Sequence, residues 1–145
     1  MEDDNLQINL SKRQLQYVYN MLSQLKIKGA SINRARYRVI ELLKIELKVL
    51  NHDKESLINT YAVKDAAGKL VVKDDQYQIT SGKRGVFNQA SIELMTEPVL
   101  ITIDDYQPQF QKLYNFLNNY DLELEGTSAM AFGAFLDALE VAGIK

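Results

Sequence analysis

The chain contains no cysteine and a single histidine, His52, among its 145 residues. Without thiols it cannot form disulfides, thiolate zinc sites or iron–sulfur clusters, and it has no cysteine nucleophile. One imidazole also excludes every site that needs two histidines, such as the metal centre of phosphohydrolases with a His-Asp pair, although Asp53 follows His52. The fold therefore depends on an apolar core, and a chain of this length buries roughly 70% of its unfolded surface.

Long hydrophobic runs are also missing from the sequence. The longest uninterrupted one is AMAFGAFL at 129–136, far short of the roughly 20 residues that span a bilayer. The first ten residues, MEDDNLQINL, are acidic where a secretion signal is basic. We therefore expect synthesis in the cytoplasm and no membrane partner.

Three kinds of motif resemble ligand sites but lack a required feature. The segment DLELEG at 121–126 has the acids that open a calcium loop, but the twelfth position, a bidentate acid in such loops, is Phe132. The turn GKRG at 82–85 lacks the Walker spacing. The acid pairs at 74–75 and 104–105 fit a turn and a helix cap. We predict no catalytic residue, no metal and no cofactor.

The first part of the chain predicts an antiparallel helical hairpin over residues 11–63. A short strand precedes it, because Leu6, Ile8 and Leu10 alternate with polar residues. Ser11 and Gln14 have capping-box spacing, so the first helix is expected to start there. Gly29 is expected to end it, and Ser31 to cap a long second helix over 32–63. The apolar positions that recur at three- and four-residue steps in the two helices, with polar Lys54 inserted between Leu50 and Leu57, are Leu15, Val18, Leu22, Leu25, Ile40, Leu43, Leu47, Leu50, Leu57 and Tyr61.

Residues 64–145 predict a small mixed region of short strands and two or three helices. The predicted elements are strands at Lys69–Lys73 and Gln76–Thr80 joined by a turn at Asp74-Asp75, a helix within 81–97, a β-branched strand at Val99–Ile103, a helix over 106–120 and a last helix from about 127 to 141. The expected fold is a helix-dominated α+β domain that covers residues 1–145.

The net charge of −2 combines a basic region, an acidic region and the three acids Glu2, Asp3 and Asp4 near the start of the chain. Residues 11–50 hold nine Lys or Arg against two Glu, a net +7, whereas residues 51–145 hold eight basic and fourteen acidic residues, a net −6. The basic region is either a solvated helix surface, a face for an acidic protein, or a face for a nucleic-acid backbone. These three alternatives stay open from the sequence.

Four residues of the basic region are the candidate partner-binding residues: Arg34, Arg36, Tyr37 and Arg38. Arg34 and Arg38 lie one helical turn apart and could bind neighbouring anionic groups beside Tyr37. In the last predicted helix, Ala129/Gly133 and Ala134/Ala138 are small residues four apart, which permits close approach of a helix from a second copy.

The segment ARYRVIELLKIELKVLNHDKESLINTYAVKDAAGKLVVKDDQYQI, at 35–79, resembles a family of small phage and prophage proteins of Gram-positive bacteria known as a domain of unknown function. The helix FNQASIELMTE and the strand VLITI continue the resemblance, which covers residues 6–105, and the last forty residues add little to it. It implies a phage-encoded accessory or structural protein associated with tail and late genes. It supplies no active-site residue.

We therefore expect a non-enzymatic interaction protein, a tail-associated virion component or a morphogenesis factor. Its expected partner is a phage structural protein, a host protein or a second copy of the chain. Its expected location is the cytoplasm of an infected or lysogenic bacterial cell, or the virion itself. The alternative is a nucleic-acid-binding phage regulator that uses the same basic hairpin. A weaker alternative is an enzyme that works with carboxylates alone and binds its metal through Asp and Glu.

Overall fold

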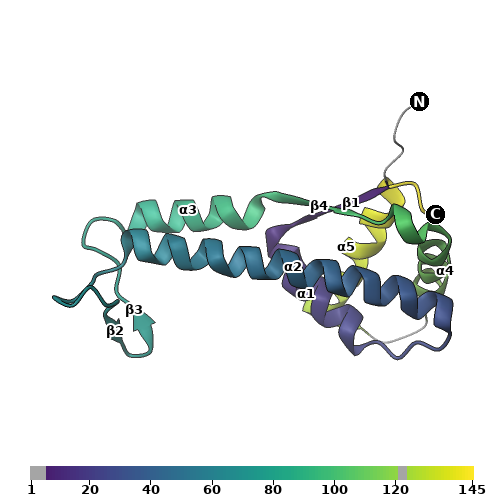
Figure 1. The fold of residues 1–145 in the computed structure, drawn as a ribbon, viewed down its shortest axis with the longest axis horizontal. Helices are drawn as coiled ribbons and strands as arrows, with labels where there is room; N and C mark the ends of the chain where they lie inside the picture. The colour runs from purple at the N-terminus through teal and green to yellow at the C-terminus, as the bar shows by residue number, and fades with distance from the viewer. Residues whose placement is uncertain (1–5, 121–123) are drawn as a thin grey trace. The chain divides into compact units, whose positions relative to one another are not determined.

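The computed structural model describes residues 6–120 and 124–145 (Figure 1). The chain forms two compact units. The terminal unit comprises Met1–Leu47 and Pro98–Lys145, and the central unit comprises Lys48–Glu97. The described helices are α1 (Lys12–Gln24), α2 (Ala30–Tyr61), α3 (Arg84–Thr96), α4 (Gln107–Asn118), α5 (Thr127–Val141) and the short 3₁₀ turn η1 (Asp104–Tyr106).

A two-stranded antiparallel sheet lies in the terminal unit. Strand β1 (Gln7–Ser11) pairs with β4 (Pro98–Thr102), so the two ends of the unit are joined across about ninety residues of sequence. Burial alternates along both strands, and the pairs Ile8–Ile101 and Leu10–Val99 lie on the buried face. The alternation of apolar and polar residues determines this register, because a slip by one residue would expose all of these side chains.

Helix α5 completes the core of the terminal unit. It packs against α1, β1 and α4, and Phe135 and Leu139 on its inner face are fully buried. Tyr114 of α4 donates a hydrogen bond from its hydroxyl to Glu140 Oε2 of α5 at 2.7 Å. This bond joins α4 to α5, which the sequence predicts as two helices without indicating a contact between them.

The connection between α1 and α2 differs from the sequence prediction. The capping box at the start of α1 is confirmed: the Ser11 N–H donates to Gln14 Oε1 at 2.9 Å. However, α1 ends at Gln24, well before Gly29, because Leu25 adopts an extended backbone. Gly29 has a φ of +107° and lies directly before α2, which begins at Ala30. The prediction that Ser31 caps α2 was therefore wrong.

The central unit consists of the second half of α2, a β-hairpin and α3. Strands β2 (Val72–Lys73) and β3 (Gln76–Tyr77) are joined by Asp74 and Asp75, whose φ values of +53° and +62° fit a type I′ turn. The predicted hairpin turn is confirmed, although the regular strands are shorter than predicted. The chain that follows α2 pairs with the hairpin through bridges that join Ala62 to Ile79 and Lys64 to Leu70.

The helix-dominated α+β fold, with its long second helix, is confirmed. The prediction of one domain over residues 1–145, divided at 63/64, stays a prediction. The chain's two compact units have one boundary between Leu47 and Lys48, inside α2, so a single helix contributes to both of them.

Candidate interaction surface

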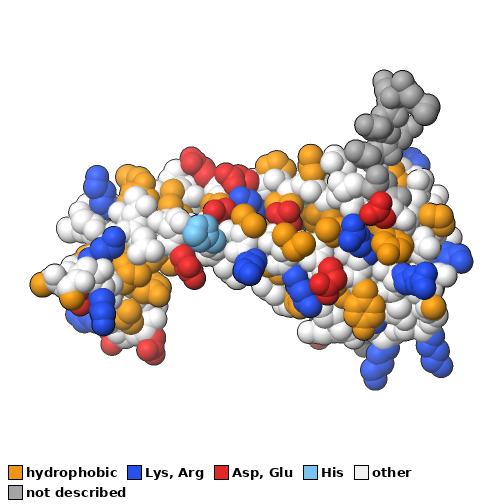
Figure 2. Space-filling view, viewed as in Figure 1, with side chains coloured by type: hydrophobic (Ala, Val, Ile, Leu, Met, Phe, Trp, Pro, Cys, Tyr) orange, Lys and Arg blue, Asp and Glu red, His pale blue; other side chains and the backbone are white. Residues whose placement is uncertain are grey.

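The first part of α2, from Ala30 to Glu41, lines an open hollow of about 610 Å³ on the terminal unit. Positions three, four and seven residues apart share one face of a helix, and the lining follows this spacing from Ala30 to Glu41. The 3₁₀ turn η1 contributes one aromatic side chain. The residues that line the hollow are Ala30, Asn33, Arg34, Tyr37, Arg38, Glu41 and Tyr106. Figure 2 shows several basic side chains over this half of α2 and over the connection from α1.

Arg38 is bound to protein groups from a distant part of the sequence. Its Nη2 lies 3.2 Å from Asp105 Oδ2, and its Cζ lies 6.0 Å from the centroid of the Tyr106 ring. The Asp105 side chain is 68% exposed and that of Arg38 is 38% exposed, so the pair is well solvated and contributes little stability. The pair therefore orients the Arg38 side chain. Breaking this ion pair would cost little free energy.

Arg36 has a structural role on another side of α2. Its guanidinium donates hydrogen bonds to the main-chain carbonyl oxygens of Leu22, at 3.2 Å, and Leu25. These carbonyls lie at the end of α1, where main-chain acceptors lack helical partners and a cation is favoured by the helix dipole. Its Cζ also lies 5.6 Å from the centroid of the Tyr37 ring. Arg36 thus joins the two arms of the helical hairpin.

Arg34 and Tyr37 are the two exposed members of the predicted set. Tyr37 is 59% exposed, and Arg34 is also classed as exposed. Within residues 6–120 and 124–145, no carboxylate forms an ion pair with Arg34. Arginine and tyrosine are two of the residue types enriched among the hot spots of protein–protein interfaces.

Two buried polar atoms of the hollow lack partners within the part of the chain that the structure describes. They are Arg38 Nε and Asn33 Oδ1. The Asn33 amide nitrogen is fully used, because it donates to the carbonyl oxygens of Ile27 and Gly29 at 2.9 Å each. A buried donor or acceptor without a partner is costly, and because both atoms are buried they are not contact points for a partner.

The four predicted residues therefore have three different environments: Arg34 and Tyr37 face solvent, Arg38 is paired, and Arg36 supports the hairpin. Sequence patterns did not connect this region with Tyr106, which lines the hollow, or with Asp105, which pairs with Arg38 from 67 residues away. Glu41 also pairs with Lys44, three residues further along α2, and their charged atoms lie 3.3 Å apart. Glu41 and Asp105 make the surface mixed in charge rather than uniformly basic.

Other candidate sites of the sequence gain no support from the geometry. Among the described residues there is no group of three or more His, Asp or Glu arranged to hold a metal ion. The first acids of the calcium-like segment, at 121–123, lie outside the described residues. His52 is exposed on α2. No described helix combines the length and the apolar character that crossing a bilayer requires.

Comparison with known proteins gives a family match. Residues 6–142 match the family described as "Protein of unknown function (DUF1617)". The chain belongs to the DUF1617 family. The DUF1617 match extends beyond residue 105 through α4 and α5, so the last part of the chain, which added little to the resemblance, is also part of the family pattern. Every residue that lines the hollow lies inside the DUF1617 match. No curated protein and no solved structure matches the chain.

Proposed function

We propose that this DUF1617 chain is a phage-encoded, non-enzymatic interaction protein that binds an acidic protein surface through the hollow on α2. The observation that carries the proposal is the placement of two exposed side chains, Arg34 and Tyr37, over a hollow that also holds the half-exposed side chain of Arg38. A carboxylate of a partner can accept from Arg34, and from Arg38 when Arg38 releases Asp105, while an apolar side chain packs on Tyr37.

A protein partner fits this surface better than a nucleic acid. A phosphate backbone requires several cations that are free to contact successive phosphates. Arg36 is bound to main-chain carbonyls and Arg38 to Asp105, which leaves Arg34 as the fully exposed arginine of the three. Glu41 and Asp105 would also repel phosphates. Mixed charge around an exposed aromatic ring is typical of protein interfaces.

The phage assignment is supported by the resemblance of the 35–79 segment to small phage and prophage proteins. On that basis the partner is a phage structural protein or a host protein, and the chain acts as a tail-associated virion component or morphogenesis factor. It would then be located in the cytoplasm of the infected or lysogenic cell, or be incorporated into the virion.

Site-specific photo-crosslinking tests the proposal. A benzophenone amino acid replaces Tyr37 in the full chain, which is expressed in a bacterium that produces the phage. The control carries the same group at Tyr17, an aromatic position of the terminal unit that is also exposed. A crosslink to one virion protein from position 37, absent from position 17 and lost with Arg34→Glu, is the expected result.

Two outcomes contradict the proposal. Crosslinks from position 37 to nucleic acid, with binding that weakens steeply with salt, would favour the regulator. Equal crosslinking from positions 17 and 37 would show that the hollow has no special role.

A further inference from the structure

The central unit has very little buried core of its own. Of the 26 buried apolar residues among those described, 24 lie in the terminal unit, and Leu50 and Ala62 are the two in Lys48–Glu97. Small units that bury so few side chains are rarely stable without a metal, a disulfide or a second subunit. Cysteine is absent, and larger apolar side chains of the unit are only half buried.

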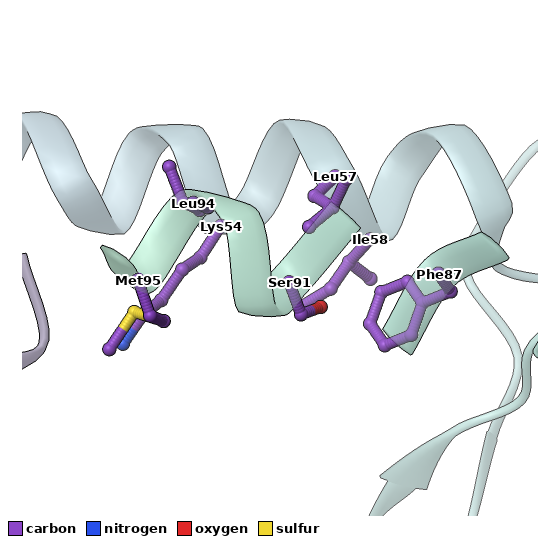
Figure 3. A pocket seen from close by; sticks show the side chains of 7 residues that line it. All are labelled: Lys54, Leu57, Ile58, Phe87, Ser91, Leu94 and Met95. Atoms are coloured by element: carbon purple, nitrogen blue, oxygen red, sulfur yellow. The ribbon is translucent and has the colours of Figure 1, made fainter. Parts of the chain in front are cut away.

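The half-buried side chains form an apolar groove between the second half of α2 and α3. The two helices lie side by side, and Tyr61 meets Phe87 edge to face at a centroid distance of 6.1 Å. The groove has a volume of about 200 Å³ and is lined by Lys54, Leu57, Ile58, Phe87, Ser91, Leu94 and Met95. Figure 3 shows Phe87, Ser91 and Met95 in a row along α3, with Ile58 and Lys54 of α2 beside them.

The charges of α3 are arranged against its own dipole. Lys83 and Arg84 stand at the amino end, where acids are favoured, whereas Glu93 and Glu97 stand at the carboxyl end, where bases are favoured. The first turn contains no acid and the last turn no base. This arrangement disfavours an isolated α3 but suits a helix with an antiparallel neighbour of the same sequence, because each basic end then meets an acidic end.

We propose that a second copy of the chain covers this groove, so that two α2–α3 hairpins pack face to face about a two-fold axis near Ala90 and Ser91. The axis places Phe87 of each copy near Leu94 of the second, around small residues that allow close approach. The result is a four-helix arrangement in which each half-buried apolar side chain of the groove becomes part of a core.

The charge balance of the central unit also favours a second copy as the occupant. Lys48–Glu97 contains seven Lys or Arg and seven Asp or Glu, so two copies carry no net repulsion at this surface. In a two-fold symmetric dimer, the contact between the basic amino end of one α3 and the acidic carboxyl end of the second α3 occurs twice. This surface is separate from the α2 hollow, so the inference does not depend on the proposed function.

Sedimentation equilibrium of the full chain with charge-reversed variants tests the inference. The wild-type protein is expected at twice the 16.6 kDa chain mass. Lys83→Glu/Arg84→Glu makes both ends of α3 acidic, and Glu93→Lys/Glu97→Lys makes both ends basic. Each variant alone should raise the dissociation constant at least roughly tenfold, because attraction becomes repulsion at both ends. An equimolar mixture of the two should recover the dimer.

The mixture separates a lost interface from a lost fold, since two unfolded variants would not restore each other. In addition, Lys83→Glu/Arg84→Glu corrects the helix dipole, so loss of the dimer cannot come from a weaker α3. The matched control, Lys69→Glu/Lys73→Glu, changes the net charge equally on the β-hairpin and should stay dimeric. Ser91→Glu should prevent dimerisation from inside the groove, whereas Gln89→Glu, on an exposed position of α3, should not.

Two results overturn the inference. A wild-type chain that stays monomeric at high micromolar concentration would leave the groove to a helix of another protein. A dimer that none of the α3 variants affects would use another surface, such as the small residues of α5.

Discussion

The guanidinium of Arg36 donates a hydrogen bond to the main-chain carbonyl oxygen of Leu25, just beyond the last residue of α1. A second bond reaches the carbonyl oxygen of Leu22 at 3.2 Å. The long side chain thereby closes the helical hairpin at the position where α1 ends. Arg36 is therefore a stabilising residue, although it lies between Arg34 and Arg38, which line the hollow.

Arg36→Ala is expected to lower the free energy of unfolding by about 1.5–3 kcal/mol, because two carbonyl oxygens lose a charged donor. Urea denaturation followed by circular dichroism measures this change. Arg34→Ala, which removes an exposed arginine two residues earlier, should change stability by no more than about 0.5 kcal/mol. Equal effects of the two substitutions would contradict the structural role of Arg36.

The Arg38–Asp105 pair is expected to be weak. A double-mutant cycle with Arg38→Gln and Asp105→Asn should give a coupling energy below about 1 kcal/mol, because both side chains are solvated. The coupling should decrease further when salt is added. A coupling well above this value would mean that Arg38 is not available to a partner carboxylate, and would count against the proposed use of the hollow.

Tyr114 is expected to make stability depend on pH in the alkaline range. The hydrogen bond to Glu140 raises the pKa of the Tyr114 hydroxyl above its ordinary value of 10.0, and burial and the negative charge of Glu140 raise this pKa further. The folded state thus keeps the proton after the unfolded state has lost it. The contribution of Tyr114 to stability is complete below about pH 10 and is lost as the pH rises through the higher pKa of the folded state.

Urea midpoints of the wild type and Tyr114→Phe, compared at about pH 8 and about pH 10.5, measure this effect. The wild type should have the higher urea midpoint at about pH 8, and the difference between the two proteins should decrease at about pH 10.5. Glu140→Gln keeps an oxygen that can accept the bond but removes the charge, so the tyrosinate absorbance of Tyr114 should then develop at lower pH. A difference in urea midpoint that is the same at both pH values would contradict the raised pKa of Tyr114.

Asp75→Gly is expected to stabilise the β2–β3 hairpin by about 0.5 kcal/mol, since glycine adopts a φ of +62° without the steric cost that a side chain has there. Asp-Gly is also a preferred pair for the type I′ turn. Hydrogen exchange of the Gln78 amide, which donates to the Val71 carbonyl oxygen at 3.3 Å, measures the change. Asp75→Ala lacks the polar side chain that tolerates this backbone and should have the opposite effect.

The sequence by itself determined most of the local structure. Alternation at Ile8 and Leu10 predicted β1, the capping box at Ser11 predicted the start of α1, and Asp74-Asp75 predicted the hairpin turn. These signals are local, because the groups that form each turn, cap or stripe lie within a few residues of one another. The match to the DUF1617 family also depends on the sequence alone.

Tertiary structure decided how α1 ends and what each arginine does. The local sequence pattern indicated Gly29 as the end of α1. The helix ends earlier, where Arg36 of α2 donates to the carbonyl oxygen of Leu25, and no local pattern shows this contact. The four candidate residues were adjacent in sequence and were treated as one basic face, yet Asp105 pairs with Arg38 from 67 residues away. The Arg38–Asp105 pair depends on the position of η1, which follows β4. The pairing of β4 with β1 determines this position, and that pairing depends on the packing of the whole terminal unit.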